Sequence, residues 1–153
     1  MKSSTTMVLA AACLMLSLGT GVANYHQYAR FLTIEDVQKI TGLKDVTQAP
    51  QQPSAKEEMI FLSKDGDPVL TASFLPASAY VGARSSKAGV KSMVQGIGEE
   101  AFVGPASGPP LYILVFRKGP YTVVIDTELT GKTPVIPIEQ LTAIAKLIAS
   151  RIQ

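Results

Sequence analysis

The sequence predicts an α+β domain, in which an antiparallel sheet of about five to six strands carries an N-terminal and a C-terminal helix. Helical patterns lie near both ends of the chain, and two pairs of apolar runs joined by turn residues lie between them. No internal repeat interrupts this order. We therefore divide the chain into a signal segment at 1–23, a lead-in at 24–32 and a single α+β domain at 33–153.

The first 23 residues have the three parts of a secretory signal peptide. Lys2 precedes a charge-free apolar stretch that begins at Met7, and small residues lead to Ala23. We expect cleavage after Ala23 and a mature protein that is periplasmic or secreted. The alternative is a retained membrane anchor, although seventeen charge-free residues from Met7 to Ala23 are at the lower limit for a spanning helix. Contact with a membrane is expected only in that case.

A short helix is predicted over residues 34–41. Thr33 and Asp36 match a variant of the capping box that begins helices, and Gly42 is a typical residue for the end of a helix. The polar and aromatic lead-in at 24–32 precedes this helix without a periodic pattern of its own.

Two hairpins are predicted in the middle of the chain. The first joins residues 58–63 to 69–75 through a turn that contains Asp65-Gly66, a frequent pair in hairpin turns. The second joins residues 111–116 to 121–127. Its first strand is apolar on both faces, which is typical of a central strand that is covered on both sides.

The remaining segments are predicted as short strands, loops and a last helix. Ile138 begins a helical stripe of apolar residues that continues to Ile152. Residues 76–89 are predicted as a short helix or a mobile loop. Short strands are expected at 90–94 and 100–103, and loops at 48–55, 104–110 and 130–137.

Several of these segments resemble a group of small exported bacterial domains of unknown function. The segments are Leu32–Gly42, Val94–Phe102, Tyr112–Gly119 and Glu139–Arg151. The resemblance covers most of residues 31–153 and implies an α/β/α sandwich similar to PsbP. It carries no catalytic residues over to this chain, so it bears on the fold and leaves the function open.

The run from Gly96 to Ala101 matches the dinucleotide-binding pattern Gly-x-Gly-x-x-Ala by its letters. That pattern works only where a helix follows and its N-terminus holds the pyrophosphate. Here Phe-Val-Gly-Pro follows, and Glu99 and Glu100 would repel phosphate. We therefore expect a tight turn or a bulge before a short strand, and no cofactor.

Asp126 and Glu128 are the candidate catalytic residues. Alternation places both on one face of a predicted strand, where paired carboxylates can shift a pKa or bind a hard cation such as Ca²⁺. The solvent-facing side of an edge strand would explain the same residues. We predict no metal site.

Composition narrows the classes of function. Fourteen Lys and Arg residues against twelve Asp and Glu give a formal charge of +2, too small for a nucleic-acid binder. The single histidine, His26, has no second His or Cys partner for a metal or a catalytic triad. The single cysteine, Cys13, lies in the signal segment, which excludes a disulfide framework.

These observations favour an exported, non-catalytic binding or accessory domain of the bacterial cell envelope. Its partner would be an unknown protein or small ligand, and the loops at 76–89 and 104–110 would form the contact surface. One alternative is a carboxylate-dependent envelope enzyme, a hydrolase, that uses Asp126 and Glu128. Another is a membrane-tethered interaction domain that keeps its first 23 residues.

Overall fold

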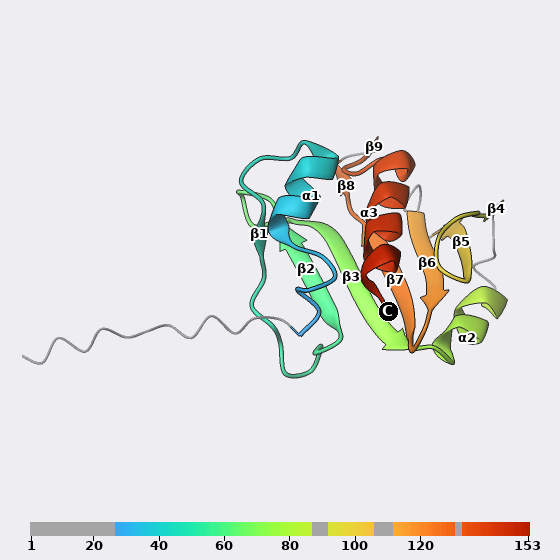
Figure 1. Ribbon diagram of the computed structural model, residues 1–153. Coiled ribbons are helices and arrows are strands. Elements are labelled where there is room, and N and C mark those ends of the chain that lie inside the picture. The colour runs from blue at the N-terminus through green and yellow to red at the C-terminus, as the bar shows by residue number, and fades with distance from the viewer. Residues whose placement is uncertain (1–26, 87–91, 106–111, 131–132) are drawn as a thin grey trace, which may run out of the picture.

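The computed structural model describes residues 27–86, 92–105, 112–130 and 133–153 (Figure 1). The predicted signal segment, Cys13 and His26 lie outside the described residues. Among the described residues, no helix is both long enough and apolar enough to cross a membrane.

Seven strands form one antiparallel sheet in the order β1-β2-β3-β7-β6-β5-β4. The strands are β1 (Thr47–Gln48), β2 (Glu58–Leu62), β3 (Pro68–Pro76), β4 (Ser92–Met93), β5 (Glu100–Pro105), β6 (Tyr112–Lys118) and β7 (Tyr121–Thr127). The helices are α1 (Ile34–Thr41), α2 (Ala79–Ser85) and α3 (Ile138–Arg151). The α+β class is confirmed, with slightly more strands than predicted.

Helix α1 begins and ends at the predicted residues. The Thr33 hydroxyl accepts the backbone N–H of Asp36, and the Asp36 carboxylate accepts the backbone N–H of Thr33 at 2.9 Å. Gly42 ends the helix with a positive φ of 73°, a conformation that costs glycine little. The capping box is therefore confirmed with Asp in place of the commoner Glu.

Both predicted hairpins are confirmed. β2 pairs with β3 and β6 pairs with β7, and the long ladder between β3 and β7 joins the two hairpins into one sheet. β7 is consequently the fourth of the seven strands. The expectation that Asp126 lies on an edge strand is therefore wrong, because the partner of β7 on one side comes from the other hairpin.

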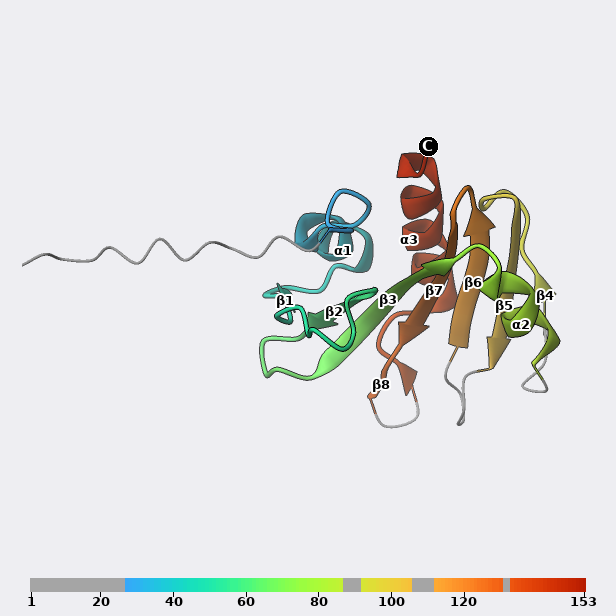
Figure 2. The same cartoon turned by 90° about the horizontal axis from the view of Figure 1, so that it is seen from below.

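The two faces of the sheet are covered to different extents. Helices α1 and α3 lie side by side on one face, which we call the inner face (Figure 2). On the opposite face, which we call the outer face, α2 packs against β6 and β5 through Tyr80, Phe102 and Val115. β6 is apolar on both faces because a helix covers each of them, as the sequence predicted.

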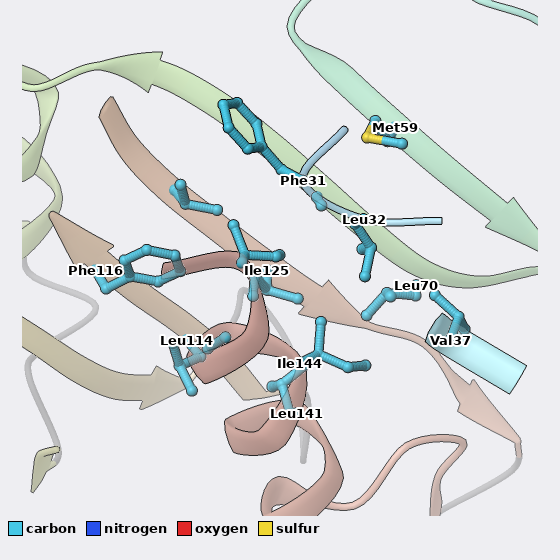
Figure 3. Packing of buried hydrophobic residues seen from close by; sticks show 14 of the residues in the cluster. Phe31, Leu32, Val37, Met59, Leu70, Leu114, Phe116, Ile125, Leu141 and Ile144 are labelled. Carbon is cyan, nitrogen blue, oxygen red and sulfur yellow. The ribbon is translucent and has the colours of Figure 1, made fainter. Parts of the chain in front are cut away.

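The main core lies between the inner face and the two longer helices (Figure 3). Alternate residues of the central strands point into it, and the helical stripe of α3 meets them from above. The fully buried side chains that Figure 3 labels include Leu32, Met59, Leu70, Leu114, Phe116, Ile125, Leu141 and Ile144.

The end of the lead-in packs into this core. The ring of Tyr28 stacks on Phe74 with 4.3 Å between the centroids, and Phe31 and Leu32 are buried. The guanidinium of Arg151, at the end of α3, pairs with both carboxylate oxygens of Asp36, with 3.0 Å between Nη2 and Oδ1. The packed region thus extends back to Tyr28, before the predicted boundary at residue 33.

The elements that sequence patterns missed are short. β1 has two residues, and β8 (Leu129–Thr130) and β9 (Thr133–Pro134) form a small separate sheet that overlaps the predicted 130–137 loop. Two residues carry no alternation that a sequence can display. In the segment 76–89, the helical alternative is present as α2, while residues 87–89 lie outside the described residues.

Candidate functional site

The outer face of β2, β3 and β7 carries no helix in the described part of the chain. Cross-strand register brings Glu58, Ser73 and Val124 into one row of this face, and Ile60, Thr71 and Asp126 into the next. All of these side chains except Glu58 are partly buried. The surface is therefore a mixture of apolar and polar groups rather than a fully solvated polar face.

Asp126 is half-buried in this surface, between Thr71 on β3 and Ile113 on β6. Burial raises its pKa from 3.8 to about 6, and the negative charges of Glu128 and then Glu58 contribute to the same shift. A carboxyl with a pKa near 6 exists in both protonation states close to neutral pH.

Glu128 follows the end of β7 and is exposed. It is close enough to act on the charge of Asp126, so the structure brings the two predicted residues near each other. Among the described residues, no group of three or more His, Cys, Asp or Glu side chains is arranged to hold a metal ion. The raised pKa of Asp126 gives this pair the chemistry of a proton donor or acceptor.

A pocket of about 450 Å³ lies beside the covered half of the outer face, and we call it the α2 pocket. Its lining comes from three elements far apart in the sequence. The lining residues are Tyr80, Val81, Arg84 and Ser85 of α2, Glu100 of β5 and Arg117 of β6. A pocket of this volume accommodates a small molecule or the side chains of a partner.

Two hydrogen bonds fix the start of α2 against the sheet. The backbone N–H of Ala77 donates to the carbonyl of Pro120, and the buried hydroxyl of Thr122 donates to the carbonyl of Ala77, each at 3.0 Å. The turn between β6 and β7 thereby sets the position of α2 over β6. The buried ring of Tyr80 then packs against Phe102, with 5.7 Å between the centroids.

The hydroxyl of Tyr80 is buried and has no hydrogen-bond partner of normal geometry among the described residues. Burial raises the pKa of Tyr80, and the nearby carboxylate of Glu100 raises it further, against the opposing charges of Arg84 and Arg117. A buried hydroxyl without a good partner costs free energy, so it identifies a place where a further polar group would be favourable.

Two ion pairs border the pocket. Nη1 of Arg84 lies 3.3 Å from Glu100 Oε2, and Nε of Arg117 lies 3.1 Å from Glu99 Oε2. The second pair is supported by the backbone N–H of Gly119, which donates to Glu99 Oε1 at 3.0 Å. The Arg117 guanidinium carbon lies 5.9 Å from the centroid of the Tyr80 ring.

The turn at Gly96–Gly98 places the two glutamates. Gly98 has a positive φ of 57°, and a Cβ added there would lie 2.4 Å from the carbonyl oxygen of Arg117. This close approach lets the Glu99 N–H donate to the same carbonyl at 2.8 Å. The prediction of a tight turn before a short strand is confirmed, because β5 and not a helix follows the glycines.

Sequence reasoning did not identify the α2 pocket. It interpreted Glu99 and Glu100 as groups that repel phosphate, and it gave Arg117 no role in a site. The missing signal was register, since Glu100 and Arg117 are paired across β5 and β6. The α2 residues that line the pocket belong to the first of the two segments expected to form a contact surface, 76–89, and the contact itself stays a prediction; residues 106–110 of the second segment lie outside the described residues.

Comparisons with protein-family models, with curated proteins and with solved structures give no match.

Proposed function

We propose that the protein is an exported, non-catalytic binding or accessory domain of the bacterial cell envelope. The observation that carries this proposal is the unequal covering of the sheet. The inner face is closed by two helices, whereas the outer face carries the α2 pocket and a half-buried carboxyl at Asp126. Titratable side chains whose pKa is shifted by burial lower the stability of the folded state when they are ionised, and they are frequent at binding and catalytic sites.

Two features of the sequence support the location and the fold group in this proposal. Residues 1–23 have the basic, apolar and small-residue parts of a signal peptide. The segments that resemble small exported domains with a PsbP-like sandwich overlap α1, β5, β6 and α3. Helices on both faces of an antiparallel sheet are compatible with that sandwich.

Site-specific cross-linking in cells tests the binding role. A photo-crosslinking amino acid at Val81, which is 67% exposed beside the α2 pocket, should capture one defined partner in the envelope fraction. The matched control carries the same amino acid at Ala143, an exposed position on α3. Capture of the same species from both positions, or from neither, would contradict a binding surface at α2.

The intact mass of the protein from its native envelope tests the location. Loss of residues 1–23 supports an exported, released domain. A full-length mass supports the membrane-tethered alternative, in which the first 23 residues stay as an anchor.

A second candidate function is that of a carboxylate-dependent hydrolase, and the pKa of about 6 at Asp126 favours it. Complementation of a strain that lacks the gene provides the test. If Asp126→Ala combined with Glu128→Ala restores the wild-type phenotype at wild-type protein levels, the hydrolase is excluded at its best site.

A further inference from the structure

We propose that the α2 pocket binds a small ligand that carries one carboxylate group, with Arg84 and the hydroxyl of Tyr80 as its anchoring donors. This inference rests on the proposed binding function and assigns a chemical class of ligand to it. Three properties of the pocket point to that class. It has an excess of hydrogen-bond donors, it contains an exposed and replaceable ion pair, and the charges of its two arginines equal those of the two glutamates beside them.

The excess of donors comes from Arg84 and Tyr80. A guanidinium has five N–H donors, and the only hydrogen bond of the Arg84 side chain in the described structure is the one from Nη1 to Glu100. The hydroxyl of Tyr80 is a further donor that is buried without a good partner. A ligand that satisfies these groups must bring acceptors, and a carboxylate brings two oxygens that match a guanidinium edge.

Arg117 is less available than Arg84. One oxygen of Glu99 accepts the N–H of Gly119 at 3.0 Å, and the other lies 3.1 Å from Nε of Arg117 in an ion pair without hydrogen-bond geometry, so this buried Nε has no hydrogen-bond partner among the described residues. These contacts hold Arg117 against the Tyr80 ring. Arg117 therefore forms a positively charged wall of the pocket, and Arg84, whose side chain is 50% exposed against 36% for Arg117, is the group that a ligand engages directly.

The pair between Arg84 and Glu100 is replaceable. Its side chains are 50% and 41% exposed, and a single contact of 3.3 Å joins them. Exposed pairs of this kind contribute little to stability, because water and salt screen them. A carboxylate that binds Arg84 with two oxygens would displace Glu100, so Glu100 acts as a competitor for the ligand's position.

The charge balance of the pocket selects a monoanion. Arg84 and Arg117 carry two positive charges, which Glu99 and Glu100 neutralise. Moving Glu100 away exposes one unit of positive charge, which matches a carboxylate better than a dianionic phosphate. The exposed side chain of Val81 and the ring of Tyr80 offer apolar contact to the body of such a ligand.

Titration of the exported form of the protein with benzoate, followed by amide NMR spectra at constant pH and ionic strength, tests the proposal. We expect saturable shifts at Val81, Arg84 and Glu100, and binding at least tenfold tighter than that of uncharged benzamide. Arg84→Gln should weaken benzoate binding at least fivefold, and Tyr80→Phe should weaken it about threefold. Lys146→Gln, on the exposed side of α3, removes the same charge as Arg84→Gln and should change nothing.

Glu100→Gln makes the sharpest distinction. If Glu100 competes with the ligand, this variant should bind benzoate several-fold more tightly than the wild type. A purely structural role of Glu100 predicts weaker binding or none. A peptide with a free C-terminal carboxylate, compared with its amide, shows whether the carboxylate comes from a small acid or from a polypeptide end.

Three results would overturn the carboxylate site. They are the absence of saturable shifts with benzoate, equal binding by the wild type and Arg84→Gln, and tighter binding of inorganic phosphate than of benzoate. If a specific cross-link forms at Val81 and any of these results is also obtained, the carboxylate class of ligand is refuted, whereas the proposed binding role is still supported. The absence of that cross-link contradicts a partner surface at α2, and it does so independently of the benzoate result.

Discussion

The inner face of the sheet is covered by α1 and α3, whereas the described residues cover the outer face only beside β5 and β6, through the seven residues of α2. Charged groups follow the same division. On the helical side, the guanidinium of Arg151 is the main cause that lowers the pKa of Asp36. On the outer face, burial without a cationic partner among the described groups raises the pKa of Asp126.

The two faces therefore differ in what their side chains do: those of the inner side stabilise the fold, whereas some on the outer face lack a partner. On the inner side, apolar packing and a paired carboxylate stabilise the folded state in the same region. The outer face keeps a carboxyl that destabilises the fold when it is ionised, together with a buried hydroxyl that lacks a good partner. We infer that the inner side maintains the fold and that the outer face is where a ligand or partner acts.

The largest expected difference comes from adjacent residues of β7 that point to opposite faces. Ile125 is fully buried against the helices, while Val124 is partly buried on the outer face. Ile125→Ala should lower the free energy of unfolding by about 4 kcal/mol, and Val124→Ala by about 1 kcal/mol. Urea denaturation measures both, and equal losses would show that the two faces contribute alike.

Asp126→Asn should stabilise the protein at neutral pH. The folded state binds the Asp126 proton more tightly than the unfolded chain does, so wild-type stability falls as the pH rises from about 4 to about 6. A shift from 3.8 to about 6 corresponds to a cost of up to about 3 kcal/mol above that range. Denaturation at pH 7.5 should show the gain and denaturation at pH 4 should not; a gain of equal size at both would reject the titration as its cause.

Asp36→Asn should have the opposite sign. The pairing with Arg151 lowers the pKa of Asp36, so the carboxylate contributes stability above the ordinary pKa of aspartate and loses it as the pH falls through the lowered value. We expect a loss of about 1–2 kcal/mol at pH 7. Chemical denaturation from pH 7 to pH 2 should show this loss shrinking toward zero, and a loss that stays constant would contradict the assignment.

Glu128→Gln gives the smallest expected effect and tests the coupling on the outer face. Removing its negative charge should lower the pKa of Asp126 by less than about one unit, because burial is the larger cause of the shift. Carboxyl-carbon NMR titration of Asp126 measures the change. Lys146→Gln serves as the distant control, and a pKa that does not move would remove Glu128 from the site.

Sequence patterns predicted the elements that a long periodic signal specifies. The capping box placed α1, the apolar stripe placed α3, and turn residues between apolar runs placed both hairpins. What the patterns lacked was the pairing of distant strands. The ladder between β3 and β7 moved Asp126 from a supposed edge to the middle of the sheet, where burial changes its pKa.

The α2 pocket was beyond sequence reasoning for a related reason. Its lining residues lie up to 37 positions apart, from Tyr80 to Arg117, and no motif spaces them. Only the register of β5 on β6 and the anchoring of α2 at Ala77 bring them together. Asp126 and Glu128 were identified because they sit two residues apart on one strand, a spacing that the sequence displays directly.

The edge strands of the sheet bear on the way a partner recognises this domain. In the described part of the chain, the edge strands β1 and β4 each pair with their neighbour over two residues. The neighbour of β4 is β5, which ends at Pro105, a residue that has no N–H to donate. A peptide that extends a sheet needs a longer run of free backbone groups. Recognition by added strands is therefore disfavoured at these two edges, and so is edge-to-edge aggregation of the domain. In the binding function that we propose, specificity would then come from side chains, so substitutions on the outer face could change the partner while the sheet and its helices stay the same.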